Sequence, residues 1–270
     1  MMSSTSHCGI VLVLGAAFLL CSLQHSFAQV RVETGFLNRT VEIAGTVYKY
    51  QVYVPSTYSQ AQTWPVILFL HGAGERGNDG LLQTQTGLGT AIRQNAARYP
   101  AIVVFPQCPP DSIWVGEPSQ AAMAALQKTL QEFKTDANRV YLTGLSMGGN
   151  GTWYLAYRHP ESFAAVVPIC AWIQRNNSWV SKFEPVVPDN TEAAFATVAK
   201  KLARVPVWIF HGEADGAVPV GQSRQAAAAL TAIGAPVQYT ELPGTGHNSW
   251  DAAYGSEKFV AWLFEQRRGK

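Results

Sequence analysis

Short apolar runs recur along most of this chain, and their pattern predicts a sheet. Residues 36–43 and 46–54 are rich in β-branched and aromatic side chains and meet at Ala44-Gly45, which predicts an antiparallel hairpin. The later runs are mainly apolar at successive positions, as expected of strands covered on both faces. These runs are 66–70, 102–105, 140–142, 164–167, 205–210 and 237–242.

Helical patterns separate these runs. Within residues 123–133 the apolar side chains lie three or four residues apart, and residues 191–203 and 220–233 are rich in alanine. This alternation predicts an α/β fold: one mostly parallel sheet with an N-terminal antiparallel hairpin and helices on both faces. In such a sheet the functional residues are expected just after the carboxyl ends of the strands.

Composition and charge indicate a globular protein and argue against one class of partner. The 270 residues are 47% apolar and 14% charged, which is typical of a globular chain with a sizeable core. The net charge is only +2, and no cluster of Lys and Arg offers a phosphate backbone a strong field. We therefore expect no nucleic-acid partner.

The first 28 residues have the pattern of a secretory signal peptide. They contain no Asp, Glu, Lys or Arg, residues 10–20 form an apolar or small-residue run, and Ser26-Phe27-Ala28 ends the segment. The run is too short for a comfortable membrane span, and the large Leu20 before Cys21 disfavours a lipid anchor there. We predict a signal peptide over residues 1–28, one single domain over 29–270, and a secreted or periplasmic protein without stable membrane insertion.

Gly144-Leu145-Ser146-Met147-Gly148 is a G-x-S-x-G motif between a predicted buried strand and a helical segment. In that setting a sharp turn exposes the serine as a nucleophile, and the glycines relieve crowding of the backbone. A glycine-rich loop without chemistry is the alternative. The flanking strand and helix favour Ser146 as the nucleophile.

A serine nucleophile needs a base, and elimination among the histidines leaves one. His7 and His25 belong to the signal segment, and His159 closes the helix after Ser146. His71 and His211 each end a strand before a glycine, where packing or hydrogen bonding is expected. His247 remains, in a glycine-rich loop after the last strand. It is the predicted base.

The orienting acid is predicted to be Asp215, just past the strand before that of His247. The order Ser146, Asp215, His247 is that of the α/β-hydrolases. Three rivals are less well placed. Asp189 lies in a helix-capping region, Asp251 lies at the entry of the final helix, and Glu213 lies two residues nearer its strand than Asp215.

Two backbone amides are candidates for an oxyanion hole: that of Met147, one residue past the nucleophile at a helix start, and that of Ala73, in the tight loop after His71-Gly72. The run Gly72–Gly77 also fits the dinucleotide pattern G-x-G-x-x-G. That interpretation fails because the loop continues and no acidic residue ends the next strand. With no metal-binding motif either, we expect neither cofactor nor metal.

The hairpin together with HGAGERGND, GLSMGGNGTW, YRHPESFAAVVPIC, HGEADGAVP and GTGHNSW resembles a group of secreted α/β-hydrolase esterases. That group holds feruloyl and acetyl-xylan esterases, polyhydroxybutyrate-depolymerase-like proteins and proteins labelled predicted peptidases. The resemblance implies Ser146, His247 and Asp215 as the triad. It also implies a small or absent lid, with residues 171–190 as the only insertion-sized segment.

The expected reaction is hydrolysis of a small or polysaccharide-linked ester of short acyl or hydroxycinnamoyl type. Trp114, Trp172 and Trp250 follow strand ends or catalytic loops and are candidate pocket walls, with core or rim packing as the alternative. A disulfide between Cys108 and Cys170 is disfavoured, because the topology should put other strands between them. A peptidase on the same residues and a non-catalytic binding module are the alternative functions.

Overall fold

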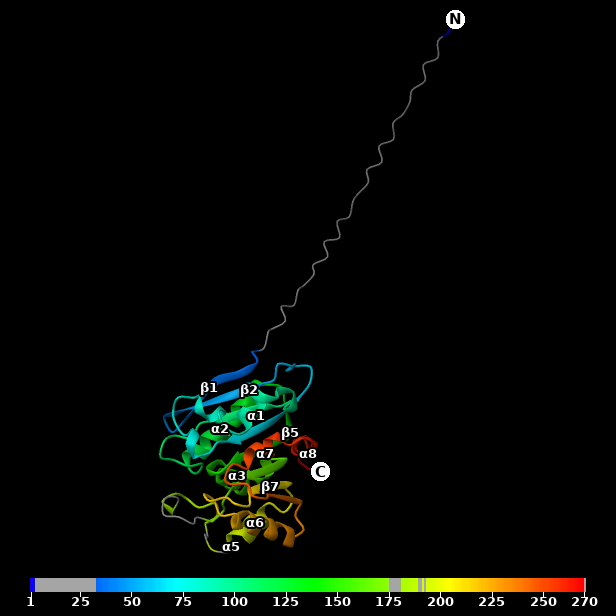
Figure 1. Ribbon diagram of the computed structural model, residues 1–270. Helices are drawn as coiled ribbons and strands as arrows, with labels where there is room; N and C mark the ends of the chain where they lie inside the picture. The colour runs from blue at the N-terminus through cyan, green and yellow to red at the C-terminus, as the bar shows by residue number, and fades with distance from the viewer. Residues whose placement is uncertain (3–32, 175–180, 189–190, 192, 270) are drawn as a thin grey trace. The chain divides into compact units, whose positions relative to one another are not determined.

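The computed structural model describes residues 1–2, 33–174, 181–188, 191 and 193–269 (Figure 1). The chain divides into two units, Met1–Val32 and Glu33–Lys270. The described strands and helices all belong to the second unit. The predicted signal segment lies outside the described residues, apart from Met1 and Met2.

One sheet of eight strands runs through the unit in the order β1-β2-β4-β3-β5-β6-β7-β8. β1 and β2 form the predicted hairpin, β2 pairs antiparallel with β4, and every later pairing is parallel. The prediction of a mostly parallel sheet with an antiparallel hairpin is therefore confirmed. The strands are β1 Gly35–Ile43, β2 Thr46–Val54, β3 Trp64–Leu70, β4 Ile102–Pro106, β5 Thr135–Leu145, β6 Ala165–Ile169, β7 Val207–Gly212 and β8 Val237–Leu242.

The hairpin turn has a simple cause. Ala44 and Gly45 both have positive φ, 48° and 83°. A two-residue turn with positive φ at both positions matches the right-handed twist of its strands. β1 and β2 therefore stay in register along their full length, from Gly35 opposite Val54 to Ile43 opposite Thr46.

Helices cover both faces of the sheet. Side chains of α1, α7 and α8 share one buried cluster with alternate strand residues such as Ile67 and Phe69. α2, α3, α5 and α6 contact the strands or one another on the opposite face. The helices are α1 Leu88–Gln94, α2 Glu117–Glu132, α3 Met147–Arg158, α5 Ala193–Lys201, α6 Gly221–Ala232, α7 Trp250–Gly255 and α8 Glu257–Glu265, and the short 3-10 turns are η1 Ala73–Glu75, η2 Leu82–Thr84, η3 Ala96–Arg98 and η4 Pro160–Ser162.

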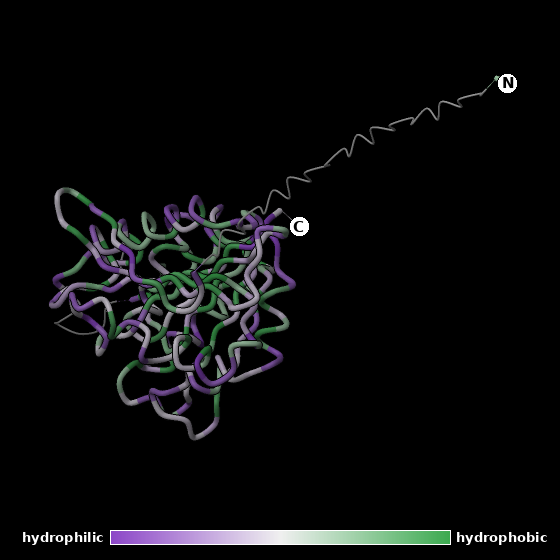
Figure 2. The backbone as a smooth tube through the Cα atoms, turned by 90° about the horizontal axis from the view of Figure 1, so that it is seen from above, coloured by the Kyte–Doolittle hydropathy of each residue, from purple (hydrophilic) through white to green (hydrophobic). Residues whose placement is uncertain are grey.

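The core follows from this layering. β3 shows it most clearly, because all seven of its residues are buried. In Figure 2 the hydrophobic stretches gather in the interior and the hydrophilic ones lie toward the periphery. No helix in the described part of the chain is long and apolar enough to cross a membrane.

Cys108 and Cys170 are both buried and unbonded. Cys108 follows β4 and Cys170 follows β6, so β3 and β5 lie between them in the sheet. The expectation that other strands separate these cysteines is confirmed.

Candidate active site

Ser146 lies at the turn between β5 and α3, in a conformation that side-chain-bearing residues rarely adopt. Its φ of 54° and ψ of −117° are those of the first central residue of a type II′ turn, a position dominated by glycine. Strain of this kind costs on the order of 1–3 kcal/mol. The Ser146 amide donates to the carbonyl oxygen of Ile169 at 2.9 Å, which ties the turn to the end of β6.

Steric crowding explains both glycines of the motif. A Cβ on Gly144 would lie 2.7 Å from the carbonyl oxygen of Leu70. A Cβ on Gly148 would overlap the same carbonyl group and lie 2.6 Å from the carbonyl oxygen of His71. Backbone oxygens at a strand end cannot move aside, so the turn accepts only hydrogen at these two positions.

The structure brings Ser146, His247 and Asp215 into one hydrogen-bonded chain. His247 Nε2 lies 2.9 Å from Ser146 Oγ, and His247 Nδ1 lies 2.7 Å from Asp215 Oδ2. The three residues follow β5, β8 and β7, so they meet at the carboxyl edge of the sheet. The Nδ1–H donates to the carboxylate, which leaves Nε2 to accept the serine proton.

The Asp215 carboxylate is fully buried but well supplied with donors. Its Oδ1 accepts the amides of Ala217 at 2.8 Å and Val218 at 2.9 Å. Burial alone would raise the pKa of Asp215, but the hydrogen bonds from His247, Val218 and Ala217 outweigh burial and hold this pKa below its ordinary value. The carboxylate is therefore ionised at neutral pH.

The rival carboxylates are engaged elsewhere. Glu213 accepts the amide of Gly244 at 2.9 Å. Asp251 accepts the side-chain amide of Asn248 at 2.7 Å. Asp189 lies outside the described residues. Of the described candidates, Asp215 is the carboxylate that His247 Nδ1 reaches.

The two strand-end histidines have the hydrogen-bonding roles expected of them. His71 is fully buried, its Nδ1–H donates to the Gly72 carbonyl oxygen at 2.7 Å, and its Nε2 accepts the Cys108 amide at 3.0 Å. Burial lowers the pKa of His71 to about 4, so the ring is neutral. His211 is likewise buried and bonds Ser223 and Val218.

The two amides predicted to form an oxyanion hole lie at helix starts. Met147 begins α3 and Ala73 begins η1, so neither amide has an acceptor within its own helix. The two turns are in close contact, because a Cβ on Gly72 would lie 2.8 Å from Leu145 Cδ1. This packing holds the loop after β3 against the Ser146 turn.

The three tryptophans differ in position. Trp250 is half-buried, and its ring stands edge-on to that of His247 with centroids 5.6 Å apart. Trp114 is 1% exposed and donates its indole N–H to the His71 carbonyl oxygen at 3.0 Å, so it packs in the core, the alternative that the sequence left open. Trp172 is buried too, with its carbonyl oxygen accepting the Asn150 side-chain amide at 3.1 Å.

Cys170 was not singled out for this site by sequence, yet its sulfur lies with the ligand atoms of Asp215 and His247 in a group whose members are all within 4.8 Å of one another. A thiol binds a metal ion as thiolate. Burial raises the pKa of Cys170 to about 12, and the other two groups are already bonded to each other. These residues are therefore poorly suited to hold a metal.

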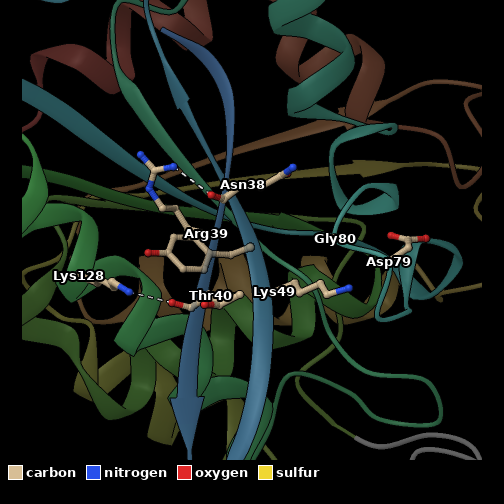
Figure 3. Close-up of a pocket in the computed structure, with 8 residues that line it drawn as sticks. Asn38, Arg39, Thr40, Lys49, Asp79, Gly80 and Lys128 are labelled. Atoms are coloured by element: carbon tan, nitrogen blue, oxygen red, sulfur yellow. Dashed lines mark hydrogen bonds between the residues drawn. The ribbon is translucent and has the colours of Figure 1, made fainter. Parts of the chain in front are cut away.

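A separate cavity of about 420 Å³ lies beside the hairpin. In Figure 3 Lys49 extends away from the strands toward the loop of Asp79, whereas Lys128 reaches toward the strands and donates to the Thr40 carbonyl oxygen. Ser146, Asp215 and His247 do not line this cavity. The remaining lining residues are Asn38, Arg39, Tyr50 and Gly80.

Two family models match adjacent stretches of the unit Glu33–Lys270. Residues 114–268 match the prolyl oligopeptidase family, and residues 42–117 match a family described as putative esterase. Together the two matches span the motif after β3 and all three residues of the hydrogen-bonded chain.

Curated relatives are longer than this chain. An uncharacterized secreted protein of Arthroderma benhamiae is 24% identical over 77% of this chain and 24% of its own length. Acetylxylan esterase A of Emericella nidulans is 26% identical over 47% of this chain and 50% of its own length. The chain thus spans about half or less of these relatives.

Solved structures agree on the fold. A thermostable esterase is 34% identical with a TM-score of 0.72, over 86% of this chain and 63% of that one. The ferulic acid esterase of Anaeromyces mucronatus, solved with ferulic acid, is 17% identical with a TM-score of 0.62, over 89% and 94% of the two chains. The chain therefore belongs to the prolyl oligopeptidase family, whose model matches more than half of it, and it has the α/β-hydrolase fold that these solved esterases share.

Proposed function

We propose that this chain is a secreted serine esterase that cleaves short acyl or hydroxycinnamoyl esters through an acyl-enzyme on Ser146. The observation that carries the proposal is the continuous chain of hydrogen bonds from Ser146 Oγ through His247 to a buried, ionised Asp215. A serine hydroxyl in this setting has the base that it needs to act as a nucleophile.

In the acylation step Ser146 Oγ attacks the ester carbonyl carbon while its proton passes to His247 Nε2. Asp215 stabilises the resulting imidazolium, and the amides of Met147 and Ala73 donate to the oxyanion. Collapse of the tetrahedral intermediate breaks the carbon–oxygen bond to the alcohol, which leaves with the proton from Nε2. The acyl group remains on Ser146.

In the deacylation step water replaces the alcohol. His247 Nε2 takes a proton from water, the hydroxide oxygen bonds to the acyl carbon, and the Ser146 oxygen leaves with the proton returned from Nε2. The products are the carboxylic acid and free enzyme. No group outside this chain and the two substrates is needed for the balance.

Relatives support the substrate class. One is named an acetylxylan esterase, and one solved neighbour holds ferulic acid. Trp250 beside His247 supplies an aromatic ring next to the reacting groups. The signal-like segment 1–28 supports export, and one relative is named a secreted protein.

A peptidase is the second candidate, because the family match over residues 114–268 is to prolyl oligopeptidases. Esters and amides use the same triad, so the leaving group decides. We expect p-nitrophenyl acetate and butyrate and a methyl hydroxycinnamate to give higher kcat/KM than p-nitrophenyl palmitate or a peptide anilide. Highest kcat/KM on the anilide would instead establish the peptidase.

The triad itself is tested by labelling and substitution. A fluorophosphonate probe should label the chain at Ser146, and Ser146→Ala should abolish the label and lower kcat by about 10⁵ to 10⁶. Asp215→Asn should lower kcat by about 10³ to 10⁴ because the imidazole loses the correct tautomer. Asp251→Asn is the matched control and should retain activity within about tenfold. A folded chain that resists the probe would favour a binding module.

A further inference from the structure

Asp215 contacts a second histidine that the triad does not use. Its Oδ2 lies 2.7 Å from Nδ1 of His247 and 3.1 Å from Nε2 of His211. Both His211 and the carboxylate are fully buried. One carboxylate oxygen is thus held between two imidazole rings, while Oδ1 is held by backbone amides.

The neighbours of His211 fix the position of its proton. Nε2 faces two oxygens that can only accept, the Val218 carbonyl at 3.0 Å and the ionised Asp215 carboxylate. The proton must therefore lie on Nε2. Nδ1 is then an acceptor, and the Ser223 hydroxyl at 2.7 Å donates to it.

Burial keeps this ring neutral. Desolvation, together with the neighbouring His247, lowers the pKa of His211 more than Val218 and Asp215 raise it. A neutral ring presents its Nε2–H to Asp215 as a dipole, without removing the charge that His247 needs. Ser223 selects the tautomer that makes this possible, because the other tautomer would put a lone pair against two oxygens.

We infer that His211, held in one tautomer by Ser223, is a positioning residue that keeps Asp215 Oδ2 aligned with His247. The inference rests on the proposed triad. The loop from Asp215 to Val218 is fixed at both ends by this arrangement, since His211 contacts Asp215 and Val218 at once. Loss of the Nε2–H would let the carboxylate turn and would weaken the alignment of the base.

Two substitutions at His211 separate positioning from packing. His211→Asn removes the donor at the Nε2 position, whereas His211→Gln can place an amide N–H near that position. We expect His211→Asn to lower kcat for p-nitrophenyl butyrate by about 10- to 100-fold, the scale seen when a group that orients a ligand is lost, with KM changed less than about threefold. His211→Gln should recover most of that loss.

Ser223→Ala is the second test, and the chain offers a close control. Ser223 and Ser119 are each the third residue of a helix, both are buried, and each hydroxyl makes a 2.7 Å hydrogen bond. Ser223→Ala should lower kcat about three- to tenfold, whereas Ser119→Ala should leave kcat unchanged. Because the two residues act as a unit, Ser223→Ala combined with His211→Asn should lose no more than His211→Asn alone.

Each outcome is decisive when the variants are shown to be folded by thermal unfolding. Unchanged kcat in both His211→Asn and Ser223→Ala, in an active chain labelled at Ser146, would overturn this inference alone. Equal losses in His211→Gln and His211→Asn, with no loss in Ser223→Ala, would show packing instead. If the wild-type chain neither turns over esters nor takes the probe, the proposed function fails and the inference fails with it. If His211→Asn does not fold, Ser223→Ala decides.

Discussion

The conformation of Ser146 makes a prediction about stability that is independent of activity. Ser146→Ala and Ser146→Gly both remove the hydroxyl but differ in backbone strain. Ser146→Ala keeps a Cβ at φ 54° and ψ −117°, and Ser146→Gly does not. The Cβ costs on the order of 1–3 kcal/mol in such a conformation. Glycine avoids this strain but lowers the free energy of unfolding by about 0.4–1 kcal/mol, because it raises the conformational entropy of the unfolded chain. Ser146→Gly should therefore be about 1–2 kcal/mol more stable than Ser146→Ala.

Chemical denaturation and thermal unfolding measure this difference directly. For a domain of this size, 1 kcal/mol shifts Tm by about 2–4 °C, so Ser146→Gly should melt about 2–8 °C above Ser146→Ala. Gly116 is the matched control, with φ 60° and ψ −132° and no atom within 4 Å of a Cβ built on it. Gly116→Ala should lose about as much stability as Ser146→Ala gains on conversion to glycine.

Two results would refute this reasoning. If Gly116→Ala is destabilised while Ser146→Gly and Ser146→Ala unfold together, then Ser146 is not strained and the turn is held by other contacts. If Gly116→Ala costs nothing, then this backbone conformation does not strain alanine, and the magnitude assigned to Ser146 is wrong as well.

Two further predictions concern buried groups near the site. The pKa of His71 lies at about 4 in the folded chain against an ordinary 6.5, so between these pH values the unfolded chain binds a proton that the folded chain does not. The contribution of His71 to the free energy of unfolding should therefore be fully present above about pH 6.5 and fall by about 3 kcal/mol as the pH drops to 4. Urea unfolding at several pH values measures this fall, and His71→Gln should lack it. Gly212→Ala would put a Cβ 2.9 Å from the Thr245 carbonyl carbon and should displace the loop of His247, lowering kcat at least tenfold without loss of fold; unchanged kcat would show that the loop can yield.

Local patterns were sufficient for the strands and the Ser146 turn. Period-two alternation identified the hairpin, and continuous apolar runs identified the strands that helices cover on both faces. The strand ends were less predictable: β5 begins at Thr135, five residues before the apolar run, because Trp64 on β3 pairs with Thr135 across a register shift. A polar strand end paired at a distance leaves no local signal.

The roles of side chains depended on contacts distant in sequence. Trp114 follows a strand-end loop as a pocket residue would, yet it is buried against His71, 43 residues away. The position of His211 at a strand end predicts packing or hydrogen bonding, and its ring makes hydrogen bonds to Ser223 and Val218. Its contact with Asp215 could not be inferred from sequence, because it depends on how the loop from 215 to 218 folds back over the strand end.

The order of strands imposes the shape of the site. Ser146 follows β5 and His247 follows β8, with β6 and β7 between them, so the two strand ends are separated by about 14 Å at ~4.8 Å per strand. The loop of His247 must therefore cross back over β7 and β6 to bring Nε2 within 2.9 Å of Ser146 Oγ. Glycine at 212 provides the clearance where this loop crosses β7, because any Cβ there would meet the carbonyl groups of Thr245 and Gly246. Asp215 also follows β7, and the amide of Ala214 beside it donates to the Thr245 carbonyl oxygen of the same loop, so the carboxylate that His247 Nδ1 contacts comes from the strand that this loop crosses.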